Sequence, residues 1–302
     1  MSETTYPSTS AGVGEAGRTL ALGVSQIFLQ ESWLAGVLMV AGLALYSVPL
    51  AAMTVLGTLV ATVSARLVTL SVAHGLQGYC GALVGAAAWT SFGAPWPAVL
   101  ATVVAAAACP AVTQAFAGVF VRFPRAGGPL PVLTAPFCVV SGLIALLVRA
   151  VLPPAAPSAA VASGNPLIQL AEAVLTGVGQ VVFAQSWLAG LVILAGLFVA
   201  GWRVGLAGLI GSLLGTLTGW AAGATPAELS VGLAGYSPCL TAIALAVVFL
   251  RPGRTAWLLA CLGAVVTVGV QYLLVLTPIP VYTWPFIVTT WLMLLIADGV
   301  RA

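Results

Sequence analysis

Ten apolar stretches, each close to the length that crosses a lipid bilayer, run through the 302-residue chain with very few charged residues between them. A helix that crosses the hydrocarbon core of a bilayer needs about 20 mostly apolar residues. Only 5% of the residues are charged, whereas a soluble domain carries about 25%. In water such a chain would expose apolar surface that nothing could cover. The sequence therefore predicts an all-α polytopic membrane protein with candidate spans, several of them short, at 33–47, 50–72, 80–94, 97–120, 134–152, 187–201, 204–223, 237–250, 255–276 and 284–299.

Two less apolar stretches and two polar segments make up the remainder of the chain. Residues 16–30 and 168–184 carry Gly, Gln and Glu, and we interpret them as half-spanning re-entrant helices. Residues 153–165 are uncharged and rich in Pro, Ala and Ser, which predicts a linker. The polar N-terminus lacks the basic region and cleavage pattern of a signal peptide and is expected to be a loose cytoplasmic tail. The predicted divisions are a tail over 1–15, a first repeat over 16–152, the linker over 153–166 and a second repeat over 167–302.

The two halves of the chain repeat one another. Gln, Pro and a Gly-x-x-Gly-Tyr pattern stay in register between them, which chance similarity of apolar sequence would not produce. Five spans per half is an odd number, so the second half would insert upside down relative to the first. This inverted-repeat plan is common in transporters, with the solute site near the midplane between the repeats. The matching segments are 23–36 with 177–190, 75–79 with 232–236, and 134–137 with 283–286.

The arginines predict how the chain is oriented. Cytoplasmic loops of membrane proteins are enriched in Lys and Arg, and this chain has nine Arg and no Lys. With the N-terminus inside, only Arg149 falls on the outer side, and the C-terminus is also cytoplasmic. The eight arginines on or near the cytoplasmic side are Arg18, Arg66, Arg122, Arg125, Arg203, Arg251, Arg254 and Arg301.

Two proline-rich breaks, one in each half, place a threonine at the start of a short helix. Residues 127–131 cannot be helical, so the next helix is expected to begin near Thr134, with Pro136 in its first turn. From Thr134 to Arg149 is 15 residues, or about 22 Å of helix, against a hydrocarbon core of about 30 Å. Irregular backbone at that depth is tolerated where protein or a water-filled cavity satisfies it. Because Thr283 repeats the pattern, two hydroxyls are predicted to meet near the midplane; two ordinary breaks between helices are the alternative.

Other polar residues in apolar surroundings are candidates for a pore lining. Gln26 and Gln180 lie in the re-entrant stretches, where an amide oxygen can line a pore or bond between helices. Glu31 would suit either a pore mouth or the membrane interface, and Glu172 the interface. His74 fits an interfacial or packed position better than a proton relay.

Other features of the sequence argue against several classes of protein. The five cysteines lie in or beside apolar stretches without metal-ligand spacing, so we expect reduced packing residues and no metal. We find no nucleotide motif and no embedded nucleophile–base pair, which argues against a cofactor and against an enzyme. A net charge of +3 from scattered arginines argues against nucleic acid as a partner. Membrane lipid is the expected surrounding.

The paired threonine motifs and the re-entrant stretches resemble those of the urea transporter family. The hallmark of that family is a pair of Leu-Pro-x-x-Thr-x-Pro-Phe motifs, which is intact at 130–137 and carries Ile for Leu at 279–286. The family's Gly-Leu-x-Gly-Phe/Tyr-Asn segment is matched at 75–80 and 232–237, except that Cys80 and Ser237 replace Asn. Its Gly-x-Gly/Ser-Gln half-helix is matched in both halves, and the likeness extends over nearly the whole chain from about residue 16.

The resemblance implies a passive urea channel of a bacterial cytoplasmic membrane, assembled as a homotrimer with one pore per subunit. It implies paired threonines at a constriction, leucines that narrow it, tyrosines and two further residues that form a flat slot, and glutamines that bind urea. The departures at Cys80 and Ser237 leave a related short amide or ammonia open as the solute. A non-conducting or enzymatic membrane protein is a more distant alternative. The implied substrate-binding residues are Gln26, Leu29, Tyr79, Leu83, Thr134, Gln180, Phe183, Tyr236, Leu240 and Thr283.

Overall fold

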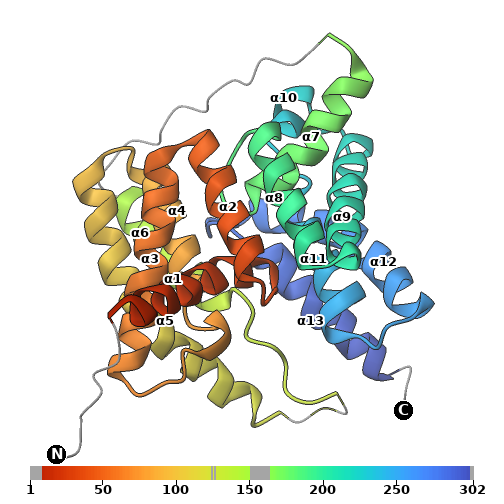
Figure 1. Cartoon of the computed structure of the whole chain (residues 1–302). Coiled ribbons are helices and arrows are strands. Elements are labelled where there is room, and N and C mark those ends of the chain that lie inside the picture. The colour runs from red at the N-terminus through yellow and green to blue at the C-terminus, as the bar shows by residue number, and fades with distance from the viewer. Residues whose placement is uncertain (1–8, 124, 126, 150–163, 300–302) are drawn as a thin grey trace, which may run out of the picture.

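The computed structural model describes residues 9–123, 125, 127–149 and 164–299, and within these residues every regular element is a helix. Figure 1 shows the first half, coloured red to yellow-green, on one side of the molecule and the second half, green to blue, on the other. The first half contains α1 (Thr9–Ser25), η1 (Gln26–Phe28), α2 (Trp33–Tyr46), α3 (Val48–Leu67), η2 (Ala73–Gly75), α4 (Tyr79–Phe92), α5 (Pro95–Phe120) and α6 (Ala135–Arg149).

The second half has the same order of long helices. Its π-helical segment Ala244–Phe249 continues directly from α11. It contains α7 (Pro166–Gln180), α8 (Trp187–Ala200), α9 (Trp202–Ala221), the short α10 (Pro226–Ser230), α11 (Tyr236–Ile243), α12 (Arg254–Val275) and α13 (Trp284–Gly299).

Length divides the helices into two groups. Among the described residues, α3, α5, α9 and α12 are long and apolar enough to cross a membrane, and a helix pair over 14–28 and 33–46 passes the same test but is bent by 79°. The apolar helices α6, α8, α11 and α13 are shorter. Five full spans per half is therefore more than helix length alone supports. The short helices leave room for non-helical backbone at membrane depth, which needs partners inside the protein.

Two predicted boundaries differ from the structure. Helix α1 begins at Thr9, so residues 9–15 are helical and not part of a loose tail. Residues 9–15 include two Gly, a Thr and a Ser, which are weak helix formers, and they lead without a break into the predicted half-helix. Most of the predicted linker lies outside the described residues, but its last residue, Pro166, already belongs to α7. Asn165 caps this helix by accepting a 2.9 Å hydrogen bond from the Leu167 amide.

Serine caps start the central helices of both halves. The Ser32 side chain accepts from the Ala35 amide at the start of α2, and Ser186 accepts from the Ala189 amide at the start of α8. Both serines have extended backbone, as an N-cap residue should. The central helices of the two halves therefore begin with the same capping side chain.

The two halves bury the same positions. The nine buried residues of α3 recur in α9 at a constant spacing of 154, beginning with Leu50 and Val204. The six buried residues of α5 recur in α12 at a constant spacing of 158, beginning with Ala98 and Ala256. Equivalent helices therefore present equivalent faces to the protein interior, which extends the repeat from short motifs to the packing of whole helices.

Helices α2 and α8 lie side by side in the centre of the molecule (Figure 1). A Cβ atom on Gly42 would lie 3.0 Å from the carbonyl oxygen of Ala189, and one on Gly196 would lie 3.2 Å from that of Ala35. Residues 35 and 42 occupy the same places in α2 that 189 and 196 occupy in α8. Because the late part of each helix meets the early part of the other, the two helices run antiparallel.

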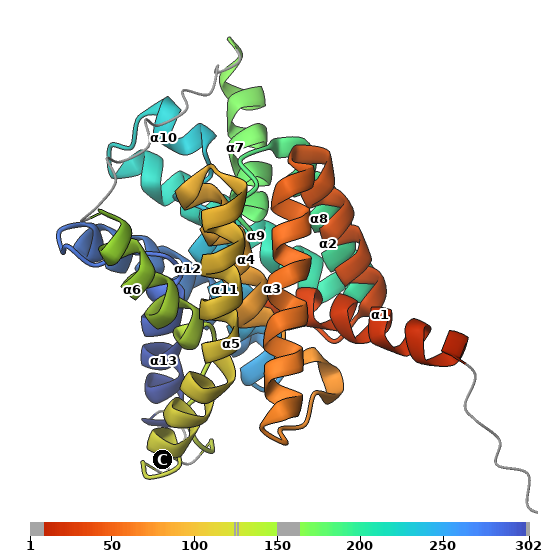
Figure 2. The same ribbon diagram turned by 90° about the vertical axis from the view of Figure 1, so that its left-hand side faces the viewer.

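Close backbone contact also joins each re-entrant helix to its neighbour. A Cβ atom on Gly36 would lie 1.8 Å from the carbonyl oxygen of Ala21, and one on Gly190 would lie 1.8 Å from that of Leu175. Only glycine permits such an approach, which resembles the small-residue interfaces of membrane helices. Figure 2, turned by 90°, shows α1 extending sideways from the base of α2.

Candidate functional site

Thr134 and Thr283 meet where the two halves cross. The Thr134 carbonyl accepts a 3.1 Å hydrogen bond from the Cys138 amide at the start of α6, and the Thr283 carbonyl accepts one of 3.1 Å from the Ile287 amide at the start of α13. Their hydroxyl oxygens lie 2.7 Å apart, and the two residues are only 1% and 3% exposed. The predicted meeting of the hydroxyls is confirmed. Each threonine stands at a helix N-terminus, but its hydroxyl bonds across to the other half.

The residue before each threonine has left-handed backbone. Leu133 has a φ of 52° and Tyr282 a φ of 37°, a region that is costly for residues with a side chain. The hydroxyl of Tyr79 donates to the Leu133 carbonyl, and the hydroxyl of Tyr236 donates to the Tyr282 carbonyl. The two tyrosines were expected as slot walls; their hydroxyls also hold the turns that aim the threonines. Sequence reasoning missed Leu133 and Tyr282, although their place directly before each threonine could have drawn attention to them.

Cys138 adds a third polar atom at the threonine pair. Its Sγ lies 3.1 Å from Oγ1 of Thr283, and the residue is 1% exposed. The equivalent position in the second half is Ile287, which offers no polar atom. The described cysteines are free, as expected, but Cys138 does more than fill space. It makes the surroundings of the two threonines unequal.

The two glutamines differ in how their amides are satisfied. Nε2 of Gln26 donates to the His74 carbonyl at 2.9 Å. Oε1 of Gln180 is buried and has no hydrogen-bond partner among the described residues. A buried acceptor without a partner is costly, so this oxygen is suited to a solute that donates N–H groups. Three residues after each glutamine, Leu29 and Phe183 have φ values of 60° and 64°, which shows the same backbone turn in both halves.

Glu31 and His74 form an exposed hydrogen-bonded pair beside Gln26. The Glu31 carboxylate contacts Nδ1 of His74, and their side chains are 54% and 60% exposed. The second half has Gln185 and Val231 at the equivalent positions, so the pair is a feature of one end of the site only. Glu31 thus lies at the protein surface and not in the buried part of the site.

An aromatic cluster lies on one side of the threonine pair only. Phe137 and Tyr282 have ring centroids 5.1 Å apart, and Phe183 lies 6.3 Å from each of them. The equivalent residues on the other side are Phe286, Leu133 and Leu29, so two of three rings are replaced by leucine. The site is therefore aromatic toward one end and aliphatic toward the other.

Leu83 and Leu240 occupy the first turns of α4 and α11, one turn beyond the two tyrosines. Both are fully buried in the same hydrophobic cluster as Phe137 and Phe286. Their predicted role in narrowing a pore stays a prediction.

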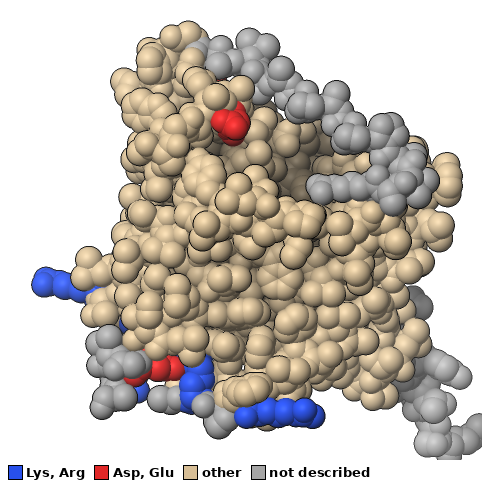
Figure 3. All heavy atoms as spheres, turned by 180° about the vertical axis from the view of Figure 1, so that it is seen from behind, with Lys and Arg blue, Asp and Glu red and all other residues tan. Residues whose placement is uncertain are grey.

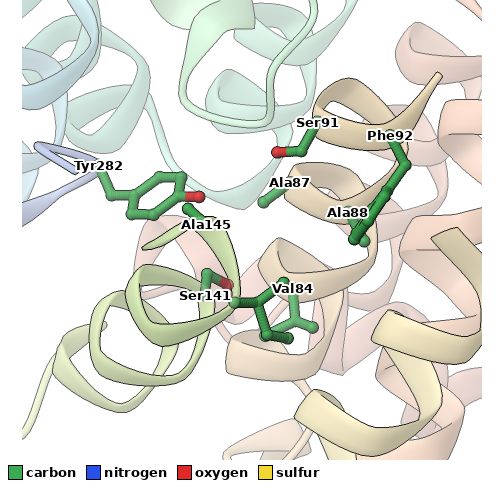
Figure 4. A pocket seen from close by; sticks show the side chains of 9 residues that line it. Val84, Ala87, Ala88, Ser91, Phe92, Ser141, Ala145 and Tyr282 are labelled. Atoms are coloured by element: carbon green, nitrogen blue, oxygen red, sulfur yellow. The ribbon is translucent and has the colours of Figure 1, made fainter. Parts of the chain in front are cut away.

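A small pocket opens next to the aromatic cluster. It lies between α4 and α6, and Figure 4 shows the Tyr282 ring projecting toward it from the turn before Thr283. Its polar groups include Ser91 and Ser141. The pocket thus borders the aromatic side of the site. Its lining residues are Val84, Ala87, Ala88, Ser91, Phe92, Ser141, Ile144, Ala145 and Tyr282.

Taken together, the apolar helices and the buried polar pair between two similar halves define a membrane transport protein. The sequence profile of the family described as "Urea transporter" matches residues 18–298, and the chain belongs to the urea transporter family. Similar proteins include "Urea transporter 1" of Rattus norvegicus, which is 26% identical over 91% of this chain and 75% of its own length. "Urea transporter 1" of Ovis aries is 27% identical over the same shares of the two chains. Members of this family move a solute and are not enzymes.

Proposed function

We propose that this protein is a passive channel that carries urea down its gradient through a pore in each subunit. The observation that carries the proposal is the buried hydroxyl pair of Thr134 and Thr283, 2.7 Å apart at the meeting of the two halves. Each hydroxyl can donate or accept a hydrogen bond. Together they can replace the water that a small polar solute loses on entering the apolar interior.

The chemistry of the neighbouring residues supports urea as the solute. Urea is flat, neutral and rich in N–H donors, and removing its water is costly unless acceptors replace it. The unpartnered Oε1 of Gln180 and the hydroxyls of Thr134 and Thr283 are such acceptors. The ring of Phe183, which lies 6.3 Å from that of Phe137, offers a flat apolar face. A line of acceptors between apolar faces favours a thin neutral molecule.

The same site disfavours ions. None of the buried side chains among the described residues is Asp or Glu, so no buried carboxylate offsets the cost of a dehydrated cation. Helices α6 and α13 begin directly after Thr134 and Thr283, and helix N-termini carry a partial positive charge. Such dipoles raise the barrier for cations and protons. Flux then needs no coupling ion.

We further propose that the halves are inverted in the bilayer and related by a two-fold axis between α2 and α8. The antiparallel contact of these helices and the repeated burial patterns support this arrangement. In the view of Figure 3, most of the visible arginines lie toward the lower part of the molecule, which supports a cytoplasmic side there. The tail and the C-terminus would lie on that side of the cell membrane, and the family resemblance supports a homotrimer.

The test is a solute panel in reconstituted vesicles. Proteoliposomes that contain the full chain are mixed rapidly with urea, a short amide or ammonia, so that a solute gradient forms across the vesicle membrane. Light scattering then follows the change in vesicle volume. Urea flux well above that of empty vesicles, and larger than amide flux, is expected. No urea flux above empty vesicles would contradict the proposal. Faster amide or ammonia flux would keep the channel and change its solute.

A further inference from the structure

A groove outside the transport site lies between the starts of α9 and α12. It is lined by Arg203 of α9 and by Arg254, Trp257, Leu258 and Cys261 of α12, together with Gly253. Arg254 is the first residue of α12 and Arg203 is the second residue of α9, and both side chains are exposed. On the face seen in Figure 3, most of the visible arginine side chains lie toward the lower part of the molecule, and one projects from its left edge near mid-height.

One wall of the groove is a continuous stripe along α12. Residues 254, 257, 258 and 261 are spaced by three and four, so they lie on one face of the helix. The stripe begins with a charge and continues with apolar side chains over about 10 Å of helix. Leu258 is 70% exposed, so the stripe is not covered by the rest of the chain. A charged end that continues into an apolar wall matches the form of a lipid.

The two arginines have no carboxylate partner within the described parts of the chain. The ion pairs there join Glu31 to His74 and Asp298 to Arg125. The guanidinium of Arg203 lies 5.3 Å from the ring centre of Trp202, which holds the cation without neutralising it. Their charge therefore remains available to an anion.

The first half supplies an internal comparison. With the spacings of 154 and 158 residues that relate the buried positions, Arg203 corresponds to Pro49 and Arg254 to Trp96. The remaining stripe corresponds to Val99, Leu100 and Val103. The equivalent surface is thus apolar and uncharged, so the fold itself does not require arginine at these two places.

We propose that this groove binds an anionic phospholipid, with its phosphate on Arg203 and Arg254 and an acyl chain along Trp257, Leu258 and Cys261. Guanidinium groups suit phosphate because they can donate two parallel hydrogen bonds. Basic pockets between membrane helices at the cytoplasmic side bind anionic headgroups in this way. The apolar stripe argues for a lipid and against free phosphate, because a free anion gains nothing from it.

The experiment is native mass spectrometry of the full-length protein in mild detergent with phosphatidylglycerol and phosphatidylcholine. The wild-type protein is expected to retain phosphatidylglycerol in preference. The double variant R203Q/R254Q should retain it about thirtyfold less well, since each arginine near a membrane surface contributes about fivefold. The control R66Q/R122Q removes two other exposed arginines outside the groove and should retain the lipid like wild type.

Four results would overturn the proposal. Equal retention of the two lipids by the wild-type protein would show that the protein does not distinguish their headgroups. Equal loss in both double variants would show that overall charge, and not this groove, holds the lipid. Displacement of phosphatidylglycerol by millimolar inorganic phosphate would show a free-anion site, and loss of the oligomer in R203Q/R254Q alone would show a contact between copies of the chain. The measurement is independent of urea flux, so its failure and that of the channel are distinguishable.

Discussion

The hydroxyl oxygen of Thr283 lies 2.7 Å from that of Thr134, although 149 positions separate the two residues. The pair depends on two separate turns, each held by a tyrosine hydroxyl from a different helix. Every member of this arrangement is buried or nearly so. The candidate site is therefore a buried polar point inside an apolar protein, and its parts can be removed one at a time.

Replacing Thr134 or Thr283 by valine keeps the shape and removes the hydroxyl. We expect urea flux in proteoliposomes to fall about fivefold, because one lost hydrogen bond is worth about 1 kcal/mol and 1.4 kcal/mol corresponds to a factor of ten. Thr134→Ser and Thr283→Ser keep the hydroxyl and should retain most of the flux. Unchanged flux in both valine variants would exclude the pair from transport.

Tyr79→Phe and Tyr236→Phe remove the hydroxyls that hold the turns before the threonines. Each change leaves a buried carbonyl of a left-handed residue without its donor, and the expected loss is about 1–3 kcal/mol of stability together with lower urea flux. Thermal unfolding in detergent measures the first effect and light scattering the second. Tyr46→Phe, at a tyrosine that is 41% exposed, is the matched control and should change neither. A melting temperature equal to that of the control would mean that the hydroxyls do not hold the turns.

The aromatic cluster should make the two ends of the pore unequal. Leu29 is the residue of the first half that corresponds to Phe183. Phe183→Leu removes a ring from the aromatic end, so we expect the urea concentration at half-maximal flux to rise severalfold. Leu29→Phe adds the missing ring and should lower that concentration. Phe123→Leu, at an exposed phenylalanine outside the site, is the control for loss of a ring. Equal effects of Phe123→Leu and Phe183→Leu would argue against a role for the cluster in binding.

Gly36→Ala and Gly190→Ala should destabilise the protein strongly. A Cβ atom at either position would lie 1.8 Å from a backbone carbonyl oxygen, so two helices must move apart. Overpacking of this kind costs about 1–3 kcal/mol and occasionally more. Gly118→Ala is the control, because nothing lies within 4 Å of its Cβ, and alanine should even favour α5 by about 0.5–1 kcal/mol. A melting temperature for Gly118→Ala below those of Gly36→Ala and Gly190→Ala would contradict the close glycine contacts.

Much of the fold could be predicted because the signals for it are local. The apolar runs placed α3, α5, α9 and α12 within a few residues, and the proline breaks placed the starts of α6 and α13. The start of α1 was missed because weak helix formers and glycines there carry little periodic signal. The predicted span 50–72 runs past the end of α3 at Leu67, since the apolar run continues where the helix has already ended.

Less of the site could be predicted, because it depends on contacts between distant residues. The sequence pointed to Thr134, Gln180 and Phe183 through the repeat and the family motifs. It did not point to Cys138 beside Thr283, since a cysteine in an apolar helix is usually a packing residue. Nor did it reveal that the rings of Phe137 and Tyr282 gather with Phe183 on one side only.

The sequence by itself determined that the chain lies in lipid, that its two halves are copies, and which threonines start the short helices. Charge content, periodic spacing and proline position are local or additive properties, so they can be read without coordinates. Only the tertiary structure decided that the two hydroxyls touch, that tyrosine hydroxyls hold the turns before them, and that one end of the site is aromatic. These relationships arise from the close packing of helices far apart in the chain, where glycine contacts and left-handed turns set which side chains face each other.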